Sequence, residues 1–344
     1  MHPATPNINP LPVEPRHWQA ELSRGFSSPA ELLASLGLTA ADCGLATDGT
    51  SDFPLRVPRG YAARMRHGDP RDPLLRQILP VLDEFLLADG FVSDPVGDLA
   101  STLTPGLLQK YAGRALLITT GACAIHCRYC FRREYPYAHH SAAASHLAPA
   151  LQAIAADPSL KEIILSGGDP LVLSESRLEN LLEALDAIPH VERIRLHSRV
   201  PVVLPERIDR RLLTLLGRLR TTVVLVIHAN HASEIDASVT AVVKSLASVT
   251  GPVLNQSVLL RGINDSSDTL TTLSRTLFSA SVLPYYLHQL DPVSGTRHFA
   301  VSDDEALALM IEMTKQLPGY LVPRLVRETP GTASKTLLGP FGAT

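Results

Sequence analysis

Three of the four cysteines in the chain lie within eight positions, as Cys123-Ala-Ile-His-Cys127-Arg-Tyr-Cys130. The aliphatic and β-branched run at residues 114–120 predicts a strand directly before them, so the three thiolates share one loop and can converge on one centre. A 4Fe-4S cluster held by three cysteines keeps one iron open, and an open coordination position is typical of a catalytic metal site. Zinc with His126 as a fourth ligand, or three buried thiols, are the alternatives. The fourth cysteine, Cys43, lies far away in the sequence.

The elements that must position this loop follow from a repeating pattern after about residue 105. Six short apolar runs predict strands at residues 114–120, 161–166, 193–198, 222–228, 253–260 and 282–288. Amphipathic segments between them predict helices at residues 176–188, 207–220 and 268–280. This alternation predicts an α/β fold, a partial (β/α)6 barrel with its working groups at the carboxyl ends of the strands. A doubly wound open sheet is the structural alternative.

The chain divides into three expected parts. Residues 1–105 form an N-terminal accessory region that is mainly helical, since residues 17–36 have helical apolar spacing. Residues 106–320 form the barrel, and residues 321–344 form a C-terminal segment.

Composition narrows the class of protein. The 344 residues are 45% hydrophobic and 19% charged, with a formal net charge of −3, which offers no general attraction to nucleic acid or anionic lipid. The N-terminus has no basic segment followed by an apolar run, and no apolar stretch of about 18 residues occurs. The clustered cysteines indicate a ligand set in a reducing compartment. We therefore expect a cytoplasmic protein that acts on a small molecule and binds neither nucleic acid nor membrane.

The cysteine loop, with Tyr129 before its last cysteine, resembles that of the radical S-adenosylmethionine (radical SAM) superfamily. This resemblance implies a 4Fe-4S cluster on the three cysteines, with S-adenosylmethionine chelating the open iron. The turn after the second strand resembles the superfamily's glycine motif, and polar residues at the ends of later strands fall where the superfamily binds the cofactor. The residues implied are Tyr129, Ser166, Gly167, Gly168, Asp169, His197, Arg199, His228 and Gln256. Without the resemblance, each would be an ordinary turn or rim residue.

Within the superfamily, the chain resembles the lysine 2,3-aminomutases from about residue 50 to residue 338. The matching segments are RALLITTGACAIHCRYCFRR, ILSGGDPL, HSRVPVVLPERI, NQSVLLRGIND, PYYLHQLDPVSGTRHF and PGTASK. The resemblance implies that Lys335 is the catalytic lysine that binds pyridoxal 5′-phosphate (PLP). It places Lys110 and Arg114 at the cofactor phosphate, although an arginine is more usual at position 110. Arg132 corresponds to the arginine that pairs with the substrate carboxylate, with Arg133 as an alternative.

The same resemblance implies the reaction and the substrate. Asp291 and Glu328 stand where the family places carboxylates for the ε-ammonium of L-lysine. The expected activity is an isomerisation of L-α-lysine to β-lysine, supported by an external one-electron donor. A 2,3-aminomutase of arginine, ornithine or glutamate is the nearest alternative, and acidic residues in the pocket disfavour glutamate. A non-catalytic iron-sulfur or zinc protein is the alternative from another class.

Departures from the catabolic enzymes point to one subfamily. Ser266 follows Asn264-Asp265 where those enzymes carry a zinc-binding cysteine, the chain stops at Thr344, and Glu328 replaces an aspartate. We therefore expect no intersubunit zinc. With the loop PGTASK, these features resemble the subfamily that makes β-lysine for modifying elongation factor P (EF-P), which implies a functional link to EF-P and its lysyl ligase. A catabolic lysine 2,3-aminomutase is the alternative.

Overall fold

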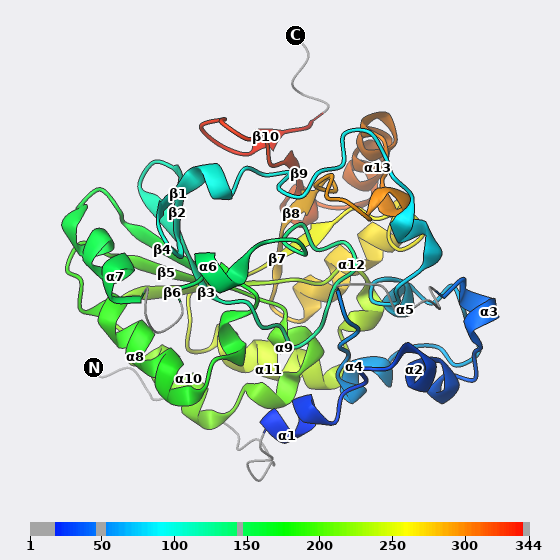
Figure 1. Cartoon of the computed structure of the whole chain (residues 1–344), viewed down its shortest axis with the longest axis horizontal. Coiled ribbons are helices and arrows are strands. Elements are labelled where there is room, and N and C mark those ends of the chain that lie inside the picture. The colour runs from blue at the N-terminus through cyan, green and yellow to red at the C-terminus, as the bar shows by residue number, and fades with distance from the viewer. Residues whose placement is uncertain (1–17, 46–52, 143–146, 340–344) are drawn as a thin grey trace.

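The computed structural model describes residues 18–45, 53–142 and 147–339. Their strands form one ten-stranded sheet in which every strand pairs with its neighbours in sequence order (Figure 1). The strands are β1 (Thr102–Thr104), β2 (Leu107–Tyr111), β3 (Arg114–Thr120), β4 (Glu162–Gly167), β5 (Arg193–Ser198), β6 (Thr222–Ile227), β7 (Val253–Val258), β8 (Leu283–His288), β9 (Arg324–Arg327) and β10 (Thr336–Leu337). Strands β3 to β9 are parallel. Antiparallel strands flank them, β1 and β2 at one side and β10 at the other.

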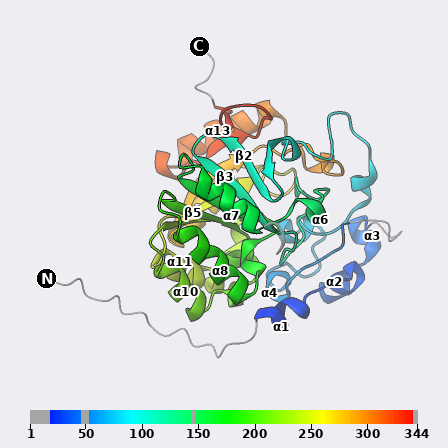
Figure 2. The ribbon, with the colours of Figure 1, turned by 60° about the vertical axis from the view of Figure 1, so that its left-hand side comes forward.

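Helices connect the parallel strands and cover the outer face of the sheet, as the succession α7, α8, α10 and α11 shows (Figure 2). The α-helices are α1 (Trp18–Ser23), α2 (Pro29–Ser35), α3 (Ala40–Cys43), α4 (Arg59–Ala62), α5 (Pro73–Arg76), α6 (Tyr137–His140), α7 (Leu147–Ala156), α8 (Glu175–Asp186), α9 (Val200–Val203), α10 (Arg210–Gly217), α11 (Ala237–Ala247), α12 (Ser267–Ser279) and α13 (Asp303–Gln316). Short 3-10 turns are η1 (Leu82–Phe85), η2 (Leu99–Ser101), η3 (Pro170–Val172), η4 (Pro205–Arg207), η5 (Ala232–Glu234), η6 (Arg297–Phe299) and η7 (Gly319–Leu321). None of the helices among the described residues is long and apolar enough to cross a membrane.

The core lies between the strands and these helices. Leu117, Leu165, Leu196 and Leu225 stand side by side on adjacent strands and are fully buried. Each such leucine contributes about 1.5–3 kcal/mol of transfer free energy. The alternate residues of these strands face the interior of the barrel, and they include the polar side chains of Ser166, Arg195 and His197.

The α/β barrel class predicted from the sequence is confirmed, and its six predicted strands appear as β3 to β8. The helix predicted at residues 207–220 is shorter, because Pro205–Arg207 forms a 3-10 turn and the Asp209 side chain caps α10 by accepting a hydrogen bond from the Leu212 amide. The helical pattern at residues 17–36 forms two helices, α1 and α2. Between them Phe26 pairs with Val57, and the close approach of the Val57 carbonyl to Gly25 leaves no room for a side chain there.

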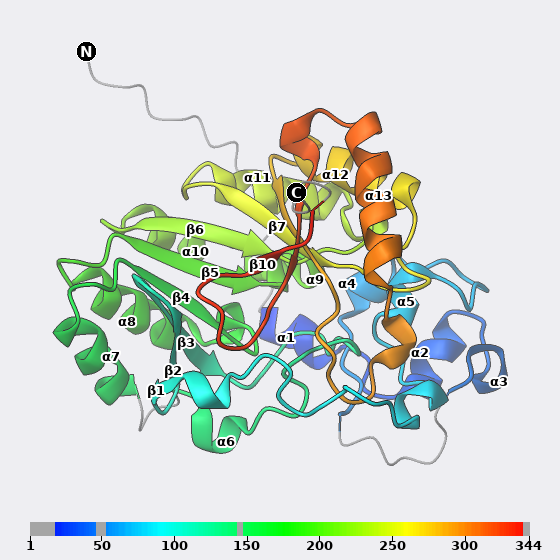
Figure 3. The same cartoon turned by 90° about the horizontal axis from the view of Figure 1, so that it is seen from above.

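The N-terminal helices and the barrel share one apolar cluster. Leu32 and Leu74 from the N-terminal part belong to the same buried cluster as the strand leucines. The predicted boundaries at residues 105 and 320 stay predictions. Beyond residue 320, β9 extends the parallel sheet, and the chain leading to β10 lies across the strands when the molecule is viewed from above (Figure 3).

Candidate active site

The three clustered cysteines lie in the loop that follows β3. They are partly buried and form no disulfide. Burial and the neighbouring cysteines raise the pKa of Cys123, and burial followed by Cys127 raises the pKa of Cys130 to about 11. Cys43 ends α3, and the pKa of its thiol is raised by burial and by Asp42, with no contribution from another cysteine.

A double-glycine turn at the end of β4 packs directly against this loop. The amides of Gly168 and Asp169 donate hydrogen bonds to the carbonyls of Thr120 and Ala122, at 2.7 and 2.8 Å. A Cβ on Gly168 would lie 2.1 Å from the Ala122 carbonyl oxygen, and Gly167 has a φ of 116°. Only glycine fits both positions, because the backbone of the cysteine loop occupies the space of a side chain.

Asp169 uses its carboxylate within the protein. It accepts hydrogen bonds from the Ser198 hydroxyl at 2.8 Å and from the amides of Arg199 and Val200 at 2.8 and 3.1 Å. Burial nevertheless raises its pKa to about 6. Asp169 thus ties the glycine turn to the end of β5 and to the start of α9.

Tyr129 leads into a buried polar network. Its hydroxyl lies 2.8 Å from His228 Nε2 and accepts a hydrogen bond from Nδ2 of the Asn230 side chain at 2.7 Å. Burial and Arg199 lower the pKa of His228 to about 3, so its imidazole is neutral at ordinary pH. Arg199 donates from Nη1 to the Cys127 sulfur at 2.7 Å and from Nη2 to Glu234 at 2.9 Å.

Gln256 and His197 lie on strands of the same barrel. Gln256 pairs in register with Tyr286 of β8, and His197 pairs with Val226 of β6. Among the described residues, Nε2 of His197 has no hydrogen-bonding partner although it is buried. Burial and nearby Arg195 and Lys335 hold the pKa of His197 well below its usual value. A buried imidazole with an unused nitrogen near Lys335 is an available contact for a bound ligand.

Lys335 lies in the turn that leads from β9 to β10, and its ammonium contacts the Glu328 carboxylate. The hydroxyl of Tyr111 donates to the other oxygen of Glu328 at 2.5 Å, and Lys110 Nζ lies 3.7 Å from that oxygen. Burial raises the pKa of Asp291 to about 7, with Lys335 lowering it and Glu328 raising it. The Lys335 ammonium therefore contacts Glu328 and acts electrostatically on Asp291, which the sequence places 37 positions before Glu328.

An acidic residue that the sequence analysis missed organises the basic side chains. Asp98 is buried and binds Lys110 Nζ at 2.7 Å and Arg132 Nε at 2.6 Å. Burial opposes its charge, but Arg132 and Lys110 hold the pKa of Asp98 below its usual value. Arg132 also donates to the Ser166 hydroxyl at 3.2 Å, which connects this group to the glycine turn. The sequence pattern could not reveal this role of Asp98, because the residue lies in an irregular segment before β1, where side chains follow no periodic spacing.

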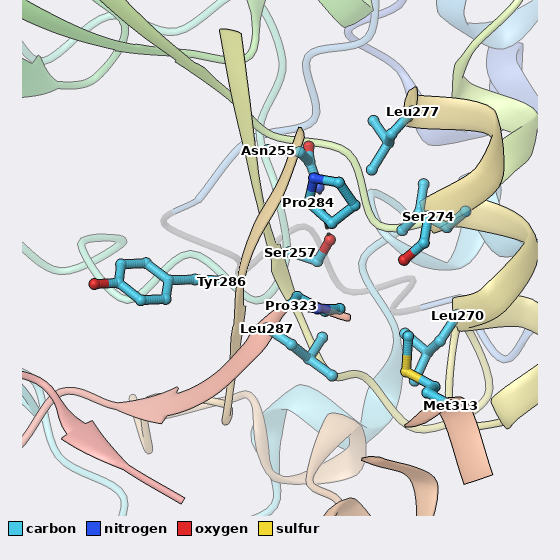
Figure 4. Close-up of a pocket in the computed structure, with 11 residues that line it drawn as sticks. Asn255, Ser257, Leu270, Ser274, Leu277, Pro284, Tyr286, Leu287, Met313 and Pro323 are labelled. Carbon is cyan, nitrogen blue, oxygen red and sulfur yellow. Dashed lines mark hydrogen bonds between the residues drawn. The ribbon is translucent and has the colours of Figure 1, made fainter. Parts of the chain in front are cut away.

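Two cavities differ in their relation to these residues. A cavity of about 310 Å³ is lined by residues from both flanks of the sheet: Val96, Ala100, Ser101, Gln109, Lys110, Tyr111, Glu328, Thr329, Gly331, Thr332 and Ala333. Arg114 stacks on Tyr111 beside it, 4.8 Å from the ring centre. The second cavity, of about 10 Å³, lies where Leu287 and Pro284 of β8 face α12, while Tyr286 extends to the opposite side of the strand (Figure 4). This second space is a packing gap about the size of one water molecule.

Comparison with known proteins identifies the family. Residues 117–270 match the radical SAM superfamily. The chain is 48% identical to the L-lysine 2,3-aminomutase of Escherichia coli over 93% of its own length and 94% of that protein. It is 40% identical to the L-lysine 2,3-aminomutase of Haemophilus influenzae, over 95% of this chain and 98% of the relative. The chain belongs to the L-lysine 2,3-aminomutase family. Its similarity to the L-lysine 2,3-aminomutase of Clostridium subterminale is lower, at 32% identity over 94% of this chain and 78% of that enzyme.

Membership of the L-lysine 2,3-aminomutase family confirms the predicted enzyme class, an isomerase. It also confirms the predicted cofactors, namely a 4Fe-4S cluster, S-adenosylmethionine and PLP. The chemistry of the donor set fits the cluster, because three free thiols belong to one loop and thiolates are the usual ligands of an iron-sulfur cluster. The zinc alternative with His126 has less support, since His126 Nδ1 lies 2.8 Å from the Pro54 carbonyl and its ring stacks on Phe53.

Proposed function

We propose that the chain converts L-α-lysine to β-lysine by moving the amino group from C2 to C3. The observation that carries the proposal is the contact of the Lys335 ammonium with Glu328, at a site where Asp291 is a second carboxylate that both groups influence electrostatically. Lys335, Glu328 and Asp291 follow strands of the same sheet as the cysteine loop. A site with two carboxylates, one of which already binds a primary ammonium, has the charge that a second ammonium, the ε-ammonium of lysine, requires.

The cofactors are assigned to two groups of residues. Cys123, Cys127 and Cys130 hold the 4Fe-4S cluster, and Tyr129, Ser166 to Asp169, His197, Arg199, His228 and Gln256 surround S-adenosylmethionine. Lys335 would hold PLP, and Lys110 and Arg114 are the cationic residues that would bind its phosphate. When bound, these groups supply a carbon-centred radical and a conjugated system that accommodates the migrating nitrogen.

The side chains of the chain bind and orient the substrate. We assign the substrate carboxylate to Arg132, whose guanidinium is fixed by Asp98 and Ser166 and so loses little freedom on binding. With PLP bound, Lys335 would no longer offer Glu328 a free ammonium. The ε-ammonium of lysine would then supply a cation to Glu328 and Asp291, whereas the side-chain carboxylate of glutamate would be repelled.

The decisive experiment is an anaerobic incubation of the reconstituted protein with L-lysine, S-adenosylmethionine, PLP and a one-electron reductant, followed by amino-acid analysis. We expect β-lysine, and no β-amino acid from glutamate. Arginine and ornithine, offered separately, measure the selectivity. Formation of a β-amino acid from one of them in preference to lysine would contradict the substrate assignment.

We propose further that the product serves the modification of EF-P in the cytoplasm. Glu328 and Ser266 support this assignment, since both depart from the pattern of the catabolic enzymes; Ser266 here caps α12 by accepting a hydrogen bond from the Thr269 amide at 3.2 Å. The test is a coupled reaction with EF-P and its lysyl ligase, read by intact mass. A larger yield of modified EF-P with the enzyme and α-lysine than with α-lysine alone is expected, and equal yields would contradict the link.

A further inference from the structure

Arg199 and Glu234 form an ion pair that touches a cluster cysteine. Arg199 is 7% exposed and Glu234 is fully buried, and the Arg199 Nη2 group lies 2.9 Å from the carboxylate. The Arg199 Nη1 group donates to the Cys127 sulfur at 2.7 Å. The positive charge of Arg199 therefore touches the Cys127 sulfur. The compensating negative charge of Glu234 lies on the other side of the Arg199 guanidinium.

The surroundings hold both members of the pair in this arrangement. Nη2 of Arg199 also donates to Gln77 at 2.7 Å and to the Tyr61 hydroxyl at 3.2 Å. Glu234 accepts hydrogen bonds from the Gln77 side chain and from the amides of Asn230 and His231, at 3.1, 2.8 and 3.1 Å. These donors stabilise the charged carboxylate in the interior. Both terminal nitrogens of Arg199 are thus used by protein atoms.

Charge and hydrogen bonding at the ligand sulfur are two of the means by which a protein adjusts an iron-sulfur cluster. Reduction adds one negative charge to the cluster, which a cation in contact with the sulfur stabilises and a buried anion nearby destabilises. Because the pair is desolvated, little solvent screening reduces either effect. The two members should therefore act on the cluster with opposite signs.

We propose that the Arg199–Glu234 pair sets the reduction potential of the cluster held by Cys127, with Arg199 raising it and Glu234 limiting that rise. The pair positions and tunes the ligand sulfur rather than reacting itself. This inference rests on the proposed cluster site and extends it to two residues, of which Glu234 lies outside every motif recognised in the sequence.

The test is a redox titration of the reconstituted protein, followed by electron paramagnetic resonance in the absence of S-adenosylmethionine. Iron and sulfide content is measured for every sample. We expect Arg199→Met to make the midpoint potential more negative and Glu234→Gln to make it less negative than in the wild type. Arg199→Lys keeps the charge but not the forked geometry, so its potential should lie between those of the wild type and Arg199→Met.

Arg195→Met is the matched control. Arg195 is an interior arginine paired with Glu162 on the neighbouring strand, and it has no cysteine contact among its described partners. Its loss should leave the midpoint potential unchanged, so an equal shift in this variant would overturn the proposal.

Other outcomes separate this inference from the proposed function. Shifts of the same sign in Arg199→Met and Glu234→Gln, or no shift in Glu234→Gln with full iron content, would also overturn it. If Arg199→Met fails to assemble a cluster, Glu234→Gln and Arg199→Lys decide alone. A wild-type protein that assembles no cluster would instead overturn the proposed function.

Discussion

Glu328 serves three partners of different chemical kinds, the Tyr111 phenol and the ammonium groups of Lys110 and Lys335. Burial opposes its charge, but Lys335 and the hydrogen bonds from Lys335 and Tyr111 hold the pKa of Glu328 below its usual value. Asp291 lacks such donors in the described structure, and its pKa is raised to about 7. The two carboxylates therefore differ in their pKa. Glu328 is a fixed anion, and Asp291 gains its charge when a cation is close.

Removing either carboxylate should weaken the preference for lysine. A charge-assisted hydrogen bond contributes about 1.5–3 kcal/mol, and about 1.4 kcal/mol corresponds to a factor of ten in rate. We expect Asp291→Asn to lower kcat/KM for lysine at least about tenfold, with normal iron and PLP content. The measurement compares lysine with norleucine, which lacks the ε-ammonium. If the lysine preference survives in both Asp291→Asn and Glu328→Gln, the substrate assignment loses its physical support.

Lys335 should be the residue that PLP modifies. Borohydride reduction of the PLP-loaded protein, followed by peptide mapping, should place the label on Lys335, the lysine whose ammonium contacts Glu328. Lys335→Ala should lose the label and keep its iron, because the cysteine loop follows β3 and Lys335 follows β9. A label on Lys244 of α11 or Lys315 of α13 would refute the assignment.

The loop after β3 and the turn after β4 form one unit at the scale of elements. The glycine turn leaves no space for side chains against the cysteine loop. Within the loop, Arg128 forms an ion pair with Glu84, which also binds Arg133 at 2.7 Å. A fully buried arginine paired in this way is costly to disturb. The loop is therefore a rigid support for the three thiolates.

Cysteine variants test this unit. Cys127→Ala should lose most of the iron after anaerobic reconstitution, because one of three ligands and the partner of Arg199 are removed together. Cys43→Ala should retain wild-type iron, since Cys43 lies in α3 away from the loop. Iron and sulfide analysis with visible absorption measures both. Retained iron in Cys127→Ala together with lost iron in Cys43→Ala would reverse the ligand assignment.

For the whole molecule, buried charge couples the site to stability. The pKa of Asp291 rises from 3.8 to about 7 on folding, so the folded state binds more protons than the unfolded state between these values. The free energy of unfolding contributed by this group therefore falls as pH rises through that window. Asp291 costs the apo-protein stability at neutral and higher pH.

Thermal unfolding should show this cost directly. We expect Asp291→Asn to be more stable than the wild type at pH 8, with a smaller gain at pH 5, where Asp291 is already protonated in the folded state. Asp303→Asn is the control. Arg327 holds the pKa of Asp303 below its usual value, so this carboxylate favours folding at high pH, and its removal should give a small loss. A loss of stability in Asp291→Asn at pH 8 would contradict the expected sign.

Sequence patterns predicted the barrel well, because βα alternation depends on local periodicity. They also placed Lys335, Glu328 and Asp291 in one site through family resemblance. They missed Asp98 and Glu234, whose roles arise only when distant segments fold together: Asp98 precedes β1 yet binds Arg132 after β3, and Glu234 follows β6 yet binds Arg199 after β5. A lone acidic residue in an irregular segment has no periodicity to reveal its partner.

Within the described part of the chain, no pairing between β1 and β10 closes the sheet on itself. Its two flanks meet instead at the cavity between β2 and the turn after β9, where Tyr111 and Lys110 reach Glu328. Two paired strands separate only when the backbone hydrogen bonds along their whole length are broken. This seam is held instead by a few side chains that can bind other partners. Loosening this seam therefore requires only an exchange of side-chain partners and leaves every strand pair intact. An amino acid that enters at the seam brings its own ammonium group. This ammonium can bind Glu328 in place of the side chains that its entry displaces.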